Sequence, residues 1–348
     1  MVGWKEKCIA AAPTSLPSNN QPSTINHFME KSSSLWQDAG HRLIRNRAAV
    51  ISVVALFLII AACIILPAIP GLIQSPDLQD LPNKNCGPSS SHGFGTDHLG
   101  RDILSRVLSG GRISIAVGLI TTLVSVSIGV CWGALSGYAG GKTDALMMRL
   151  VDILYALPFL IVVILLGKTL EPLTAELTKL VVGWLSPPGS GGASINKTTA
   201  WVEPITTLVP LFIAIGALSW LTVSRIVRAQ VQSIAKQEFV EAARSLGLGH
   251  FRILFRHILP NTLGPIIVYT TLTIPGVMLL EATLSFLGLG VKPPYSSWGI
   301  LIDEGANRML SNPWLLFFPT LFFATTLFSL NFLGDGLRDA LDPKSAKD

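Results

Sequence analysis

The chain has 348 residues, of which 49% are hydrophobic and 14% are charged, whereas roughly a quarter of the residues in a soluble domain are charged. With a mean hydropathy of +0.53, this composition argues against a water-soluble enzyme. The net charge is +5, but the basic residues are scattered between apolar segments and form no dense patch for nucleic acid. The composition therefore predicts an all-α polytopic membrane protein.

Six apolar segments are long enough to cross a hydrocarbon core, which needs roughly 20 helical residues. They are residues 48–66, 113–135, 145–166, 205–223, 263–289 and 314–333. Lys and Arg are more numerous in the connecting segments that are inside if both termini are cytoplasmic, so we expect that orientation.

The segments around the spans predict a simple domain order. A cytoplasmic arm, 1–47, whose residues 11–34 have a disordered composition, precedes an uncleaved anchor, 48–66. An exterior loop, a five-helix core and a cytoplasmic tail follow at 67–112, 113–333 and 334–348. The core includes an exterior insertion, 167–204, whose residues 186–199 are rich in Pro, Gly and Ser and predict a flexible segment.

The end of the exterior loop, 97–112, has an amphipathic pattern. Its apolar residues fall on one helix face, and the pairs Asp97 with Arg101 and Asp102 with Arg106 are each spaced i,i+4 on the other. We therefore expect a short helix on the outer membrane surface.

The polar stretch between the fourth and fifth spans, 225–260, is far longer than a turn needs and predicts a docking segment. Helix formers surround the Glu-Ala-Ala triplet at 241–243, whose small residues let another surface approach closely. Gly247 or Gly249 can end this helix in the left-handed conformation, and the next helix is expected to stop before Pro260. The alternative interpretation is a solvated loop.

The spacing of this segment resembles the coupling motif with which permease subunits of ABC importers contact their ATPase. The matching residues are Glu241, Ala242, Ala243, Arg244, Gly247, His257, Leu259 and Pro260. His257 departs from the general pattern, which tends to have Ile there. Four further stretches are similar to the dipeptide, oligopeptide and nickel permease family: FGTDHLGRDILSRVLSGGRISI, GYAGGKTDALMMRLVDILYALP, EATLSFLGLGVKPPYSSWG and NFLGDGLRDALDP.

The resemblance implies a type I importer permease fold in the bacterial inner membrane, forming half of a pore for di- or oligopeptides. It implies four partner proteins of three kinds: a second homologous permease, two ATPase subunits and an extracytoplasmic binding protein. ATP and Mg would be bound by the ATPases, so no catalytic, cofactor or metal residue is expected in this chain. The stretch SGYAGGKT, 136–143, resembles a P-loop, but Ser136 stands where that motif needs glycine.

Ionisable residues within spans are candidates for function because their burial is costly. Asp152 and Arg149, spaced i,i+3 in the third span, predict a local ion pair or a role in translocation. Glu281 falls near the exterior end of the fifth span, where it could line an outer gate or contact the amino terminus of a peptide, or else snorkel or cap its helix.

Two other functions remain open from the residues alone. A nickel or nickel-chelate importer would suit His92 and His98, six residues apart beside Asp97. A membrane-embedded enzyme would need paired Asp, Ser with Lys or His, or HExxH within a span, and we find none of these patterns. A passive channel would not need the long docking segment.

Overall fold

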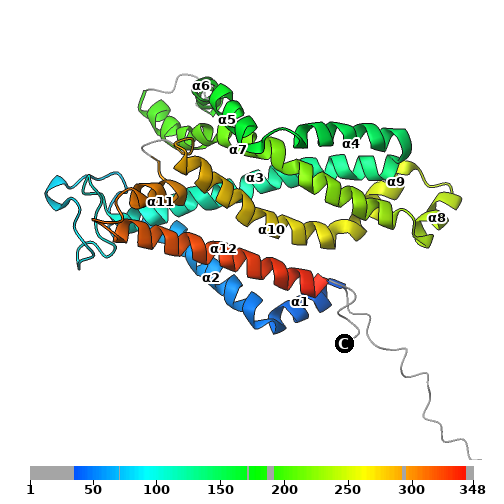
Figure 1. Ribbon diagram of the computed structural model, residues 1–348, viewed down its shortest axis with the longest axis horizontal. Coiled ribbons are helices and arrows are strands. Elements are labelled where there is room, and N and C mark those ends of the chain that lie inside the picture. Colours follow the sequence, from blue (N-terminus) through cyan, green and yellow to red (C-terminus); the bar gives the residue numbers. More distant parts are fainter. Residues whose placement is uncertain (1–34, 70, 171, 186–191, 292–294, 342–348) are drawn as a thin grey trace, which may run out of the picture.

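The computed structural model describes residues 35–341 except 70, 171, 186–191 and 292–294, and helices dominate this part of the chain (Figure 1). The predictions for residues 11–34 and for the end of the tail lie outside the described residues. The helices are α1 Leu35–Arg45, α2 Arg47–Ile65, α3 Ile103–Ala139, α4 Gly141–Tyr155, α5 Phe159–Leu170, α6 Leu173–Leu185, α7 Gly192–Ile234, α8 Glu238–Ser245, α9 His250–Ile253, α10 Leu259–Phe286, α11 Trp298–Ala306 and α12 Trp314–Leu341.

Five helical segments among the described residues are long and apolar enough to cross a membrane, namely Arg47–Ala68, Ile103–Ala139, Val209–Ile234, His250–Phe286 and Trp314–Leu341. α4 and α5 together give a sixth, but they are bent by 84° at the break between them. Pro158 lies in this break, where it disfavours helical backbone at Leu157. The prediction of six spans therefore holds if the bent pair counts as one, and the predicted third span is two helices.

α3 begins earlier than the predicted second span. The Asp102 side chain caps it by accepting a hydrogen bond from the Ser105 backbone N–H at 2.9 Å. Ile103 and Leu108 are buried in a cluster with residues of α11 and α12. The separate surface helix predicted within 97–112 is therefore wrong, because protein packing covers the apolar face that the membrane surface was expected to cover.

α3 and α7 form the most closely packed helix pair of the core. Gly129, Gly133 and Gly137 are spaced four residues apart, so they lie on one face of α3. A Cβ added at Gly129 would lie 2.6 Å from the Val223 Cβ, and one at Gly133 would meet the Ser224 carbonyl oxygen more closely still. Small residues at this spacing let two membrane helices approach to backbone contact.

The two ends of the molecule carry different elements (Figure 1). α8 and α9 lie at one end, and α12 runs toward that end, where α1 packs against it. α11 and the long segment between α2 and α3 lie at the other end. The polar docking segment and the exterior loop predicted from the sequence are thus at opposite ends of the helices.

Several segments predicted to lie outside the spans contain helices. α1 occupies the end of the predicted arm 1–47, and Ala39 on it is buried. α6 and the first turns of α7 lie within the predicted insertion 167–204. Residues 186–191 of the stretch predicted to be flexible lie outside the described residues, but 192–199 are helical. α12 continues to Leu341, beyond the predicted start of the tail at 334.

Candidate functional site

The predicted helix, turn and helix after the fourth span are present, and Gly247 makes the turn. Its φ is +75°. The Gly247 N–H donates to the Arg244 carbonyl at 2.9 Å, and the Leu248 N–H donates to the Ala243 carbonyl at 3.2 Å. These two bonds are the Schellman arrangement that satisfies the last carbonyls of a helix. Gly249 has a φ of −65°, so of the two candidate glycines only Gly247 needs the left-handed conformation.

The underside of α8 is held on the helix bundle by an apolar cluster. Val240 and Ala243 are buried in it, at 0% and 5% exposure. The cluster also contains residues of α7 and of the segment after the turn, namely Val231, Ile234, Ile253, Leu254 and Ile258. Of the two small residues predicted to face a partner, only Ala242 is exposed. Ala243 instead fixes α8 to the bundle.

Exposed side chains of α8, of α9 and of the residues that follow each helix form a surface, which we call the α8–α9 face. Its residues are Glu241, Ala242, Arg244, Leu246, Phe251 and Phe255. Leu246 is 82% exposed and Phe251 is 74% exposed, with the Phe251 and Phe255 rings stacked. Apolar side chains exposed beside charged ones are typical of a surface that binds a protein.

The helix after the turn does not stop before Pro260, contrary to the prediction. α9 passes through a π-helical segment, Leu254–Ile258, directly into α10. The Leu259 N–H donates to the Leu254 carbonyl, five residues back. Pro260 then stands at the start of α10, where the missing N–H is tolerated. His257 and Leu259 are half-buried, whereas Pro260 is exposed.

Two acid–arginine pairs join α4 to α7. Asp144 accepts hydrogen bonds from Arg228 at 2.5 Å and from Ser136 of α3 at 2.5 Å. Asp152 pairs with Arg225 at 2.7 Å, and the predicted ion pair with Arg149 is wrong. Asp144 was not among the residues predicted to matter; it directly precedes the predicted third span and lies in the first turn of α4.

Glu281 is fully buried inside the protein rather than placed at a membrane surface. Its side-chain oxygens accept hydrogen bonds from Ser114 of α3 at 3.3 Å and from Ser285 of α10 at 2.8 Å. Ser114 in turn accepts a hydrogen bond from the Trp298 backbone N–H of α11. Glu281 therefore joins three elements at the end of the molecule opposite α8. Neither snorkelling nor lining of an open gate describes this position.

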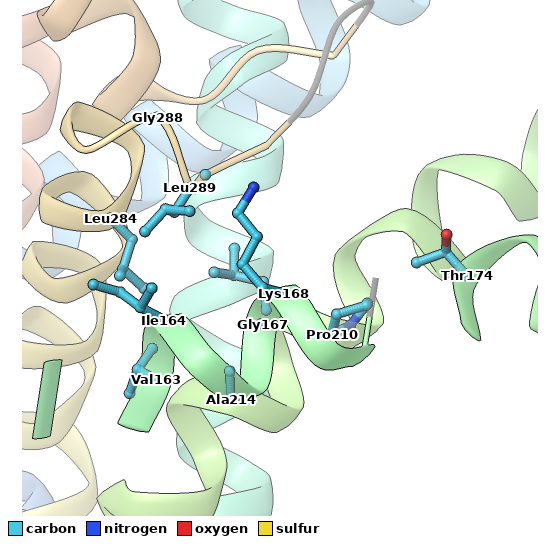
Figure 2. A pocket seen from close by; sticks show the side chains of 12 residues that line it. Val163, Ile164, Gly167, Lys168, Thr174, Pro210, Ala214, Leu284, Gly288 and Leu289 are labelled. Atoms are coloured by element: carbon cyan, nitrogen blue, oxygen red, sulfur yellow. The ribbon is translucent and has the colours of Figure 1, made fainter. Parts of the chain in front are cut away.

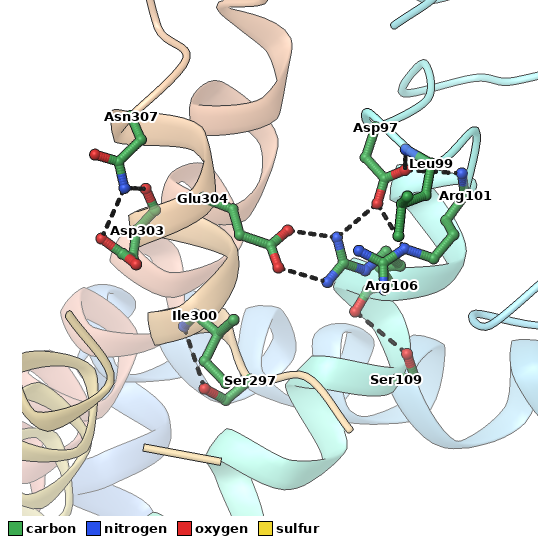
Figure 3. A network of polar contacts seen from close by, with 10 residues as sticks. All are labelled: Asp97, Leu99, Arg101, Arg106, Ser109, Ser297, Ile300, Asp303, Glu304 and Asn307. Carbon is green, nitrogen blue, oxygen red and sulfur yellow. Dashed lines mark hydrogen bonds and ion pairs between the residues drawn. The ribbon is translucent and has the colours of Figure 1, made fainter. Parts of the chain in front are cut away.

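A second polar network lies at the same end and joins α3 and α11 to the loop that precedes α3 (Figure 3). Arg106, 4% exposed, donates to Asp97 at 2.9 Å and to both carboxylate oxygens of Glu304 at 2.6 and 3.1 Å. The predicted pair of Asp97 with Arg101 is present at 2.7 Å. The predicted pair of Asp102 with Arg106 is absent, because Asp102 caps α3. No sequence signal linked Arg106 to Glu304.

The Asp97 carboxyl is buried and strongly hydrogen-bonded. Burial alone would raise its pKa, but the Arg101 backbone N–H and the Arg106 and Arg101 guanidinium groups together lower the pKa below its ordinary value. His92 is also buried, and its Nδ1 lies 3.2 Å from the Asp102 carboxylate. This contact gives His92, one of the two histidines that suggested a nickel importer, a structural role.

The described residues form neither a metal cluster nor a phosphate-binding loop. No group of three or more His, Cys, Asp or Glu side chains in this part of the chain is arranged to hold a metal ion. The P-loop-like stretch does not form a phosphate-binding loop: Ser136 lies in the last turn of α3 and α4 begins at Gly141. The Ser136 hydroxyl donates to Asp144.

Comparison with known proteins gives two family matches. Residues 129–347 match the binding-protein-dependent transport system inner membrane component. Residues 34–88 match the N-terminal TM domain of oligopeptide transport permease C.

Similar whole proteins carry related names. The chain is 43% identical to the oligopeptide transport system permease protein OppC of Haemophilus influenzae, over 92% of each chain. It is 41% identical to OppC of Bacillus subtilis, over 91% of this chain and 92% of that one. The dipeptide transport system permease protein DppC of Bacillus subtilis is 40% identical, over 89% and 86%. The chain therefore belongs to the family of inner membrane components of binding-protein-dependent transport systems.

Proposed function

We propose that the chain is a permease subunit of an ATP-driven importer of di- and oligopeptides. The names of relatives that are 40–43% identical over most of both chains support the substrate class. In this proposal a second homologous permease completes the pore, two ATPase subunits bind ATP and Mg, and an extracytoplasmic protein delivers the peptide. The chain itself transports and does not hydrolyse ATP.

The observation that carries the proposal is that the α8–α9 face is exposed while the other side of α8 is packed on the helix bundle. An ATPase docked there would contact Glu241, Arg244 and the exposed Phe and Leu side chains. Because Val240 and Ala243 fix α8 to α7 and to the helix that becomes α10, movement of the docked ATPase would move both spans. The pairs of Asp144 with Arg228 and Asp152 with Arg225 would carry α4 along.

The proposed orientation puts both termini and α8 in the cytoplasm. Two features support it: α1 packs on α12, which runs toward the end that carries α8 (Figure 1), and Lys and Arg are more numerous in the segments assigned to that side. Peptide would then enter at the end that carries α11. Of the residues proposed for the path, exposed Asp152 would face the pore together with its partner Arg225, whereas buried Glu281 would hold α3, α10 and α11 together.

Peptide is a better supported substrate than nickel. The named relatives are oligopeptide and dipeptide permeases, and the contact of His92 with Asp102 gives that histidine a structural role.

The test compares two glycines two residues apart. Gly247→Val forces a β-branched residue into the left-handed region, at a cost of about 1–2 kcal/mol, while an added Cβ would touch nothing within 4 Å. Gly249→Val is the matched control, because Gly249 has equal space and an ordinary φ. We expect Gly247→Val to lower both peptide uptake and peptide-stimulated ATP hydrolysis about 5- to 30-fold in proteoliposomes that contain the assembled transporter.

The control should behave like the wild type. Equal uptake by the Gly247→Val and Gly249→Val transporters would contradict the docking role of α8. A wild-type transporter that takes up nickel and no peptide would refute the substrate class and leave the docking role standing.

A further inference from the structure

A cavity of about 130 Å³ lies between α5, α7, α10 and the loop that follows α10 (Figure 2). It is separate from the α8–α9 face and from the polar networks described above. Most of its wall is apolar and comes from Val163, Ile164, Leu211, Ala214, Leu284 and Leu289. Gly167 leaves space on the α5 side, because a Cβ added there would meet no atom within 4 Å.

The wall on the α10 side is fixed by a second Schellman turn. Gly288 has a φ of +73° and donates its N–H to the Ser285 carbonyl at 2.9 Å. The Leu289 N–H donates to the Leu284 carbonyl at 2.8 Å, which brings these two leucines to the same wall. Leu284 is 1% exposed. The backbone turn therefore fixes the wall of the cavity on the α10 side.

One charged side chain belongs to the cavity lining. Lys168 follows Gly167 on α5 and is exposed, and its amine extends along the rim next to Leu289 (Figure 2). An ammonium group at the mouth of an apolar cavity suits a ligand with an anionic group beside an apolar side chain. A few polar groups on an apolar lining are typical of small-molecule sites.

The position of the cavity relates it to the entry of substrate. α5 and the end of α10 lie away from α8, toward the end that carries α11 (Figure 1). In the proposed orientation this is the exterior end, where peptide arrives. α5 is also the second half of the broken span, and discontinuous helices frequently form substrate sites in transporters.

We propose that this cavity receives the C-terminal residue of an incoming peptide. The apolar side chain of that residue lies between α5 and α10, and its carboxylate lies at the Lys168 amine. At about 130 Å³, the cavity is slightly smaller than a cavity of roughly 150 Å³ that holds a benzene molecule, which is the size range of one apolar side chain. A lipid acyl chain would need a longer groove. This inference rests on the proposed function and adds a preference for large apolar C-terminal residues to it.

The first test fills the cavity with a larger side chain at Gly167, where there is space to add one. Gly167→Leu places a side chain in the cavity without a backbone clash, and Gly183→Leu on α6 is the matched control, a helical glycine with equal space outside the cavity. Initial rates of ATP-dependent uptake of Ala-Ala-Phe and Ala-Ala-Ala are measured with the complete transporter in proteoliposomes. We expect Gly167→Leu to lower the ratio of the two rates about tenfold and Gly183→Leu to leave it unchanged.

The charge is tested on the same transporter. Lys168→Gln should lower the preference for Ala-Ala-Phe over its C-terminal amide about tenfold, while Lys168→Arg retains it. Uptake by Gly167→Leu and Lys168→Gln transporters with wild-type ratios would overturn the inference and leave the proposed function intact. An equal loss for both peptides would also overturn it, because the cavity would then serve packing or lipid. A wild-type transporter that takes up no peptide overturns the proposed function and this inference together.

Discussion

Replacing Arg106 with Met should be among the most damaging single substitutions at the end of the molecule that carries α11. The guanidinium is buried and donates one hydrogen bond to Asp97 and two to Glu304. Met keeps much of the apolar volume of the side chain but removes all three bonds. The Asp97 carboxylate then stays buried with only the Arg101 side chain and the nearby backbone N–H groups to compensate its charge.

The expected loss follows from which groups remain buried. Breaking a buried ion pair by removing one partner costs about 3–5 kcal/mol. The lower value applies here, because Asp97 keeps three other donors. Glu304→Gln should cost about 1 kcal/mol, since the Glu304 side chain is 31% exposed. In the double variant the two losses should not add, because both substitutions remove the same contact.

Unfolding in mixed micelles, followed by tryptophan fluorescence as the fraction of SDS increases, measures these free-energy differences. Lys84→Ala in the same loop is the control, because the side chain is exposed and its loss should change stability by less than about 0.5 kcal/mol. If Arg106→Met unfolded at the same SDS fraction as Lys84→Ala, the Arg106 network would not hold the loop, α3 and α11 together.

Two further predictions concern pH and helix packing. The folded protein lowers the pKa of the Asp97 carboxyl. The ionised carboxylate therefore stabilises the fold at any pH above the pKa that Asp97 has in the unfolded chain. This stabilisation is lost as the pH falls through the lower pKa that Asp97 has in the folded protein. The stability difference between the wild type and Asp97→Asn should therefore be largest at pH 7 and shrink below about pH 4, and an unchanged difference at pH 3 would contradict this. Gly133→Ala should lower the free energy of unfolding by about 1–3 kcal/mol, since its Cβ would meet the Ser224 carbonyl oxygen. Gly276→Ala, with nothing within 4 Å, should not lower stability in the same SDS titration, because alanine favours a helix more than glycine does, and equal losses would mean that α3 and α7 can separate without cost.

Local chemistry made much of the docking segment predictable. The left-handed turn at Gly247 follows from the few residue types that tolerate a positive φ, and the helix of α8 follows from its helix formers. The burial of Ala243 was not predictable, because it depends on side chains of α7 and of the segment after the turn. The continuation of the helix through Pro260 also escaped prediction, since a π-helical segment accommodates the proline.

The sequence by itself determined the membrane class, five of the six spans and the family, because long apolar runs and extended motifs are properties of contiguous residues. Tertiary structure decided which charges meet. Asp152 had an arginine three residues away and pairs instead with Arg225 of another helix, and Arg106 reaches Glu304 almost 200 residues later. Contacts of this kind depend on how the helices pack. The cavity beside Lys168 has the same origin, since its walls come from α5, α7 and α10, which are brought together only by folding.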